Sequence, residues 1–211
     1  MEIDFFFDTI CPWCYIGKRR LEQTLLDYKQ RNINVNWCSF LLNPDLPASG
    51  VDRNRYLARK FGSESRIKRI YGNIAKVGRS VNIGFNFNTI RQTPNSINAH
   101  RFIHYAKAYG KSETALDSLF KNYFVTGKDI GDINVLSFIA KKIGLDKNNV
   151  IAHLKSKDGL TEIYEANNRA HNIGVNGVPS FIFNGHLVIS GAQEPAVLKK
   201  MLDAAFSIEK N

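Results

Sequence analysis

Two cysteines three positions apart are the residues of this chain best suited to chemistry. Cys11-Pro12-Trp13-Cys14 follows an apolar, Phe-rich run and precedes a segment with helical spacing. A sulfur at a helix start faces unpaired backbone N–H groups and the positive end of the helix dipole, and both favour thiolate over thiol. We therefore expect Cys11 to be the exposed nucleophile. We expect Cys14 to be the more buried thiol, which closes a disulfide with Cys11.

Half of a zinc site is the main alternative for such a pair, because structural zinc needs four ligands. The sequence has no second CxxC, and the other soft ligands are Cys38 and five scattered histidines. His100 and His104 share one face of a predicted helix, but the glutamate of an HExxH motif is missing. We therefore interpret the pair as redox-active, expect no metal, and interpret Cys38 as a buried small hydrophobe.

The segments around the pair predict a strand–helix–strand unit. Residues 3–10 form the apolar run, and Leu21, Leu25 and Tyr28 have the spacing of one helix face. Pro12 suits a first helical turn, where its missing N–H has no partner. Residues 34–42 form a second predicted strand, and a helical connection between the two strands makes them parallel.

The rest of the chain divides into a helical middle and a second unit with strands. Apolar stripes at helical spacing recur from residue 44 to residue 157, apart from a predicted loop at 81–90. A helix over 160–172 then leads to two short strands, 180–183 and 187–190, joined by the turn-forming pair Asn184-Gly185. A final helix begins near Pro195. We predict an α/β protein with a βαβ half and a ββα half, split by an all-helical block.

Composition bounds the class of protein. Of 211 residues, 44% are hydrophobic and 23% charged, as in soluble globular proteins. Three cysteines are too few for a disulfide framework, and no apolar run is long enough to span a membrane. Since the first residues also lack the features of a secretory signal, we expect a cytoplasmic protein.

The net charge of +10 is concentrated in one segment. Residues 51–79 carry nine Lys and Arg residues against two acidic ones, a net +7. Such a segment could form a rim that attracts anions, but helical periodicity favours the solvated face of helices. Because no nucleic-acid-binding motif accompanies these charges, we do not expect a nucleic acid partner.

Four stretches in order carry a resemblance to a known family. They are residues 8–18 around CPWC, 95–101 (NSINAHR), 174–181 (GVNGVPSF) and 189–195 (ISGAQEP). With them the chain resembles the DsbA-like branch of the thioredoxin superfamily, and more closely its FrnE-like oxidoreductases. The resemblance implies a thioredoxin fold over residues 1–43 and 158–211, with a large all-helical insertion over residues 44–157.

The resemblance also implies a function and a set of site residues. Cys11 and Cys14 would exchange disulfides with a protein, a peptide or glutathione. Pro179 would be a cis-proline facing them, and Pro12, Trp13, Val178 and Pro179 would contact substrate. It implies no bound cofactor, with glutathione as a candidate substrate or electron donor, and leaves a homodimer open. His100 would pack within the helical block.

Two rival functions remain open at this point. Glutathione transferase kappa and the 2-hydroxychromene-2-carboxylate isomerases look like relatives in which Ser stands where this chain has Cys11. Both cysteines are retained here, which favours thiol–disulfide exchange over a glutathione-dependent transferase or isomerase. The non-enzyme rival is a zinc- or nucleic-acid-binding module.

Overall fold

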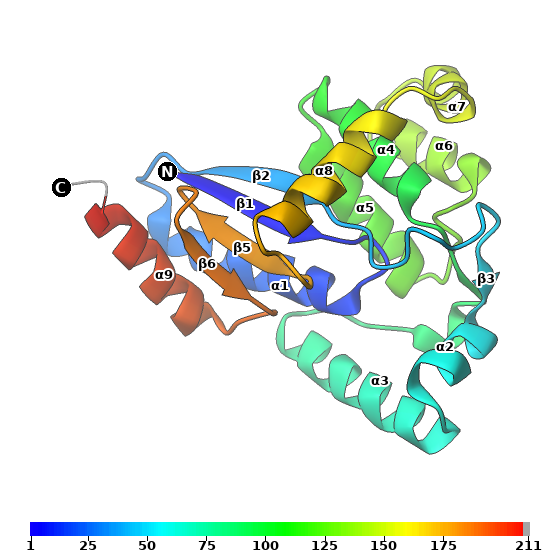
Figure 1. Ribbon diagram of the computed structural model, residues 1–211, viewed down its shortest axis with the longest axis horizontal. Coiled ribbons are helices and arrows are strands. Elements are labelled where there is room, and N and C mark those ends of the chain that lie inside the picture. The colour runs from blue at the N-terminus through cyan, green and yellow to red at the C-terminus, as the bar shows by residue number, and fades with distance from the viewer. Residues whose placement is uncertain (209–211) are drawn as a thin grey trace.

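A four-stranded mixed sheet with the strand order β2-β1-β5-β6 forms the centre of the protein (Figure 1). The computed structural model describes residues 1–208. The sheet and its connections comprise β1 (Glu2–Phe7), α1 (Pro12–Leu25), the 3₁₀ turn η1 (Leu26–Tyr28), β2 (Asn34–Ser39), β5 (Ser180–Phe183) and β6 (Leu187–Ser190). β1 and β2 are parallel, whereas β5 pairs antiparallel with both β1 and β6. The predicted βαβ and ββα halves are therefore confirmed.

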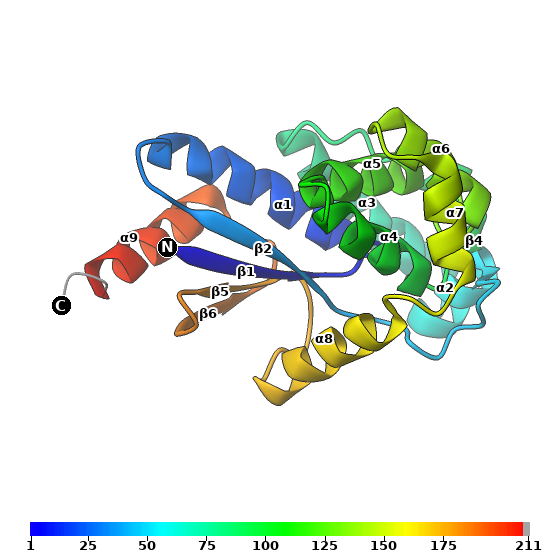
Figure 2. The same cartoon turned by 90° about the horizontal axis from the view of Figure 1, so that it is seen from above.

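The two faces of the sheet are covered by different helices (Figure 2). Because side chains alternate along a strand, Ile3, Phe5 and Phe7 of β1 point to one face and Phe6 to the other. The first face packs against α1 and α9 (Pro195–Ile208), and Phe6 joins a smaller cluster with Ala170 of α8 (Leu160–Asn172). Each buried phenylalanine contributes about 1.5–3 kcal/mol, so this alternation holds the layers together.

The segment between the two halves is mainly helical. It comprises β3 (Val51–Asp52), α2 (Arg53–Phe61), α3 (Glu64–Ser80), η2 (Phe87–Thr89), β4 (Gln92–Thr93), α4 (Ile97–Lys107), α5 (Ser112–Phe124), α6 (Ile133–Lys142) and α7 (Lys147–Lys155). The prediction of an all-helical block was wrong in one respect, since β3 and β4 pair antiparallel. Two residues are too few to show the alternation that identifies a strand. None of the helices in residues 1–208 is both long and apolar enough to cross a membrane.

Side chains end the two parallel strands earlier than their apolar runs suggest. β1 ends at Phe7 because the Asp8 carboxylate accepts the Ile10 N–H at 3.2 Å and turns the chain. Beyond β2, the Leu41 N–H donates to Asn167 Oδ1 at 2.8 Å. The Leu42 N–H donates to Asp8 Oδ2 at 2.7 Å. The predicted strands 3–10 and 34–42 are therefore each cut short, and the chain after β1 is free to start α1.

Candidate active site

The cysteine pair lies where β1 gives way to α1. Cys11 is the N-cap residue of α1, with extended backbone angles of −94° and 112°, and Pro12 occupies the first helical turn. The Cys14 N–H donates to the Cys11 carbonyl at 3.1 Å, which brings Cys14 beneath Cys11 in that turn. Both residues are free thiols. The Cys11 sulfur therefore lies at the positive end of the helix, with a second thiol behind it.

Cys11 is more enclosed than the sequence predicts. Its exposed fraction is 6% and that of Cys14 is 0%. The order of the two thiols is as expected, but Cys11 is not an exposed residue. Residues of α2 and α3 line a cavity of about 250 Å³ together with Cys11, and they cover it. A reactant must therefore enter this cavity to reach the sulfur.

The loop before β5 contacts the first cysteine. The Val178–Pro179 peptide bond is cis, and the Cys11 thiol donates to the Val178 carbonyl oxygen at 3.6 Å. Gly17 of α1 makes this approach possible, because a Cβ atom there would lie 3.0 Å from Pro179 Cγ. Three sequence-predicted site residues, Cys11, Val178 and Pro179, thus meet at one point. Gly17 was not predicted as a site residue, although it lies within the quoted 8–18 stretch.

Pro12 and Trp13 extend the same site toward the surface. Both line the cavity with Cys11, and Trp13 is 37% exposed. The indole can therefore meet a molecule that approaches the sulfur. Its position agrees with the substrate contact that the resemblance implies, and the contact itself stays a prediction.

Buried polar groups lie behind the pair. Burial raises the pKa of Cys14 well above its usual range, and the adjacent Cys11 thiol raises it further. Asp8 is fully buried, and its charge also raises the pKa of Cys14. The Nε2 atom of His100, itself fully buried on α4, lies 3.5 Å from Asp8 Oδ1. Sequence reasoning assigned Asp8 no role, although an aspartate that ends a strand is a known turn signal.

One basic residue of the segment 51–79 is buried, although the sequence predicts that these residues lie on solvated helix faces. Eight of the nine Lys and Arg residues in 51–79 are exposed, as the helical spacing predicts. Arg53 is the exception, since its side chain is buried and lines the Cys11 cavity. Tyr56, Tyr71 and Tyr123 form part of the same wall, so the cavity is aromatic with a cation inside.

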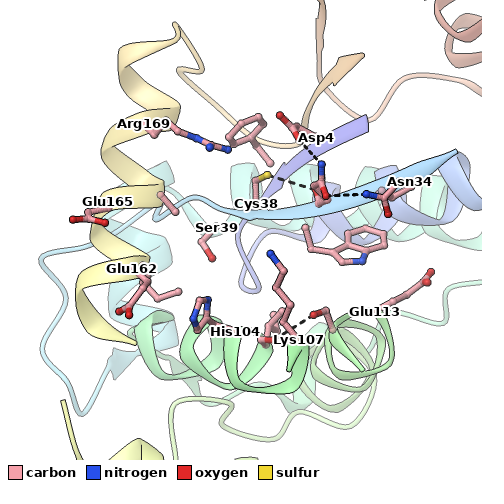
Figure 3. A pocket seen from close by; sticks show the side chains of 18 of the residues that line it. Asp4, Asn34, Cys38, Ser39, His104, Lys107, Glu113, Glu162, Glu165 and Arg169 are labelled. Atoms are coloured by element: carbon pink, nitrogen blue, oxygen red, sulfur yellow. Dashed lines mark hydrogen bonds between the residues drawn. The ribbon is translucent and has the colours of Figure 1, made fainter. Parts of the chain in front are cut away.

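A larger cavity, of about 850 Å³, lies elsewhere and contains neither Cys11 nor Cys14 (Figure 3). It follows the free edge of β2 between α4 and α8, and Cys38 lines it. Cys38 is half-buried rather than buried, because β2 is an edge strand that no further strand covers. Burial nevertheless raises the pKa of Cys38 to about 12.

Within residues 1–208, one group of three acidic side chains has the spacing of a metal site. Glu22, Glu113 and Asp117 place carboxylate oxygens within 4.8 Å of one another. The fully buried Lys18 amine lies among them, 3.1 Å from Glu113 Oε1 and 3.0 Å from Asp117 Oδ1. These three carboxylates and Lys18 therefore form an ion-pair network. Neither Cys11 nor Cys14 belongs to it.

The comparisons with known proteins identify the family. Residues 2–203 match the model of the DSBA-like thioredoxin domain, and the chain belongs to this family. The uncharacterized protein YwbO of Bacillus subtilis is 25% identical over 203 residues, which cover 96% of each chain. The resemblance to the DsbA-like branch of the thioredoxin superfamily is thereby confirmed.

Solved structures share the fold over nearly the whole chain. A probable DsbA oxidoreductase from Streptomyces coelicolor is 27% identical, with a TM-score of 0.91 over 98% of this chain and 90% of its own. The cytosolic disulfide reductase DsbM of Pseudomonas aeruginosa is 15% identical, with a TM-score of 0.71 over 99% of this chain and 100% of its own. DsbM has also been solved with GSH. At that identity, DsbM supports the fold alone.

Proposed function

We propose that this protein is a thiol–disulfide oxidoreductase of the FrnE-like type that acts through Cys11 and Cys14 on protein, peptide or glutathione disulfides in the cytoplasm. One observation carries the proposal. The Cys11 sulfur lies at the start of α1 and within 3.6 Å of the Val178 carbonyl oxygen, with the Cys14 thiol behind it. This arrangement supplies a nucleophile, a docking loop and a second thiol at one point.

The reduction of a substrate disulfide proceeds in two exchanges. The Cys11 thiolate attacks one substrate sulfur, the substrate S–S bond breaks, and one substrate thiolate leaves as a mixed disulfide forms. Cys14 then loses its proton and attacks the Cys11 sulfur. The mixed disulfide breaks, the second substrate thiolate leaves, and Cys11–Cys14 becomes the oxidised pair. Two electrons thus pass from the dithiol to the substrate, and the reverse sequence oxidises a substrate dithiol.

The surroundings of each sulfur suit its step. Cys11, the attacking and leaving sulfur, lies at the N-terminus of α1, where backbone N–H groups are unpaired. Burial keeps Cys14 protonated, since it raises the pKa of that thiol. Asp8 is fully buried and its charge raises the pKa of Cys14, and we assign Asp8 as the base that takes the Cys14 proton during the second exchange. Trp13, Pro12, Val178 and Pro179 would hold the substrate against Cys11.

Insulin-disulfide reduction tests the proposal, with wild type, Cys11→Ser and Cys14→Ser compared. We expect catalysis by wild type and none by Cys11→Ser. We expect Cys14→Ser to accumulate a mixed disulfide, seen as an added mass on the intact protein. The assay contains enough small thiol to keep the enzyme reduced. If the wild-type protein does not catalyse insulin reduction under these conditions, the proposal is contradicted.

The same variants separate the rival functions. A glutathione-dependent transferase or isomerase would keep its activity when Cys14 is replaced, because its chemistry needs no second thiol. A zinc module would bind one metal equivalent and leave both thiols unreactive to iodoacetamide. A nucleic-acid-binding module would show an affinity that falls steeply with salt.

A further inference from the structure

Arg53 is a buried cation with no carboxylate partner among the described residues. Its exposed fraction is 6%, and no ion pair joins it to an acidic side chain of residues 1–208. Its Nη1 donates to Tyr123 Oη at 3.2 Å. The guanidinium also lies 5.1 Å from the centre of the Tyr71 ring and 5.9 Å from that of Phe87. All of these partners are neutral, which is unusual because buried charges are ordinarily paired.

A donor without an acceptor lies on the same cavity wall. Lys60 Nζ donates to Tyr56 Oη at 2.8 Å, and Tyr56 Oη donates to Asn43 Oδ1 at 3.1 Å. These two hydrogen bonds orient the Asn43 amide so that its Nδ2 group is buried. Among the described residues, Nδ2 has no hydrogen-bond partner. Asn43 and Arg53 both line the cavity that holds Cys11. The cavity therefore presents two kinds of donor, and no carboxylate is among the residues that line it.

A carboxylate is the acceptor that suits this pair of donors. The planar guanidinium presents several N–H groups in a fork that matches two carboxylate oxygens, and an amide N–H can bind one of them in addition. The wall includes the aromatic rings of Tyr56, Tyr71 and Tyr123, and such a surrounding of low polarity strengthens the contact. The volume of about 250 Å³ admits a short substituent of a reacting sulfur and not a folded chain.

We propose that Arg53, with Asn43, is a specificity residue that selects disulfides bearing a carboxylate close to the reacting sulfur. This inference rests on the proposed function and concerns the same cavity. The Cys11 thiolate attacks the substrate sulfur while the carboxylate of that half binds Arg53. The substrate S–S bond breaks, the other half leaves as a thiolate, and the Cys11 mixed disulfide retains the bound carboxylate. Cys14 then releases the retained half as its thiolate, and the enzyme dithiol becomes the disulfide.

Three small disulfides that differ mainly in charge test the selection. They are dithiodipropionate (anionic), hydroxyethyl disulfide (neutral) and cystamine (cationic). Second-order rate constants of the reduced full-length protein with each are measured under single-turnover conditions. We expect the anionic disulfide to react fastest with wild type. Arg53→Met should slow that reaction by roughly 10- to 100-fold and change the rate with hydroxyethyl disulfide by less than about threefold.

Arg55→Met is the matched control, since Arg55 is exposed on the same helix and its loss changes the net charge equally. It should leave the preference for the anionic disulfide within about twofold at physiological salt. Arg53→Lys keeps the charge but loses the fork, so its preference should fall between those of wild type and Arg53→Met. The neutral disulfide also reports whether each variant is folded and active.

The outcomes separate the inference from the proposed function. Wild type that reacts with none of the three disulfides contradicts the proposed function. Wild type that reacts with all three but does not prefer the anionic one overturns the inference alone. An equal loss with all three in Arg53→Met also overturns it, because Arg53 would then act on the Cys11 thiolate rather than on the substrate.

Two sources could supply the selected chemistry, and a final pair of substrates distinguishes them. One is oxidised glutathione. The other is a peptide disulfide with Asp next to the reacting cysteine, compared with the same peptide carrying Ala. A preference for glutathione over both peptides, lost in Arg53→Met, assigns the site to small thiols. A preference for the Asp peptide, lost in the same variant, assigns it to acidic segments of proteins. Each of these results supports the inference.

Discussion

Cys11 and Cys38 each line a cavity of this protein, and they share one kind of polar contact but differ in their surroundings. Each thiol donates to a backbone carbonyl oxygen at 3.6 Å. For Cys38 that carbonyl belongs to Asn36 of its own strand, whereas for Cys11 it belongs to Val178, 167 residues away. Cys11 begins a helix, and Cys38 lies in the edge strand β2. The contact distance alone therefore does not distinguish a reactive thiol from an inert one.

The size of a cavity does not distinguish them either. The cavity beside Cys38 has more than three times the volume of the one beside Cys11. It is lined by charged groups of both signs from β1, α4, α5 and α8 (Figure 3), and its thiol has a pKa raised to about 12. The smaller cavity combines a helix N-terminus, a second thiol and a buried cation. Local backbone and charge, rather than volume, thus define the reactive site.

Replacing the two cysteines in turn should give the largest contrast. Cys11→Ser removes the nucleophile and should lower insulin-disulfide reduction by at least about 10³-fold, because hydroxyls do not exchange disulfides at neutral pH. Cys38→Ser should leave the rate within about twofold. Turbidity of reduced insulin measures both. A loss of activity in Cys38→Ser with an unchanged fold would contradict the division between the two thiols.

Alkylation against pH should separate the same two thiols by roughly 100-fold or more at pH 7.5. Only the thiolate reacts, and a pKa of about 12 leaves Cys38 almost wholly protonated there. Its labelling rate should rise about tenfold per pH unit up to pH 10. Iodoacetamide labelling of the reduced protein, read by peptide mass, measures each site. Equal rates for Cys11 and Cys38 at pH 7.5 would show that the helix start gives Cys11 no advantage.

Gly17→Ala should disturb the approach of the Pro179 loop to Cys11. Within the described chain Cys38 has no such loop against it, so this change tests a feature of the Cys11 site alone. The added Cβ would lie 3.0 Å from Pro179 Cγ and 3.3 Å from its Cβ, so the loop must shift. We expect a loss of stability of about 1–3 kcal/mol and a fall in reduction rate of roughly tenfold. Urea unfolding and the insulin assay measure the two effects.

Gly72→Ala is the matched control for this change. Gly72 lies within α3, and a Cβ there would have no neighbour within 4 Å. Alanine should therefore stabilise the protein by about 0.5–1 kcal/mol and leave the rate unchanged. If Gly17→Ala, like Gly72→Ala, leaves the reduction rate unchanged and does not destabilise the protein, the close packing of the Pro179 loop on α1 does not contribute to activity.

Local patterns were sufficient to predict the order of elements and the cysteine turn. The apolar run that begins at Ile3, the start of α1 at Pro12 and the turn at Asn184 are all encoded within a few neighbouring residues. The short strands β3 and β4 were missed because their pairing joins segments about 40 residues apart and each is only two residues long.

The features of the site that the sequence could not predict depend on distant partners. Helical spacing placed Arg53 on a solvated face, and its burial depends on Tyr71, Phe87 and Tyr123 from other parts of the helical segment. Asp8 carried a local turn signal, but its second hydrogen bond is to Leu42, 34 residues on. Residue types alone do not reveal which of these groups meet.

The smallest expected effect concerns the dependence of stability on pH at Cys38. Its folded pKa is raised to about 12, whereas an unfolded cysteine titrates near 8.5. Between these values the folded state holds more protons, so the contribution of Cys38 to stability is complete below about pH 8 and is lost as the pH rises. Between pH 8 and pH 9.5, the free energy of unfolding of wild type should fall by about 1 kcal/mol more than that of Cys38→Ala. Urea unfolding at these two pH values, about 8 and 9.5, measures the difference. An identical loss in the two proteins would mean that the Cys38 thiol ionises in the folded protein as readily as in the unfolded one, and its contrast with Cys11 would then rest on the helix start alone.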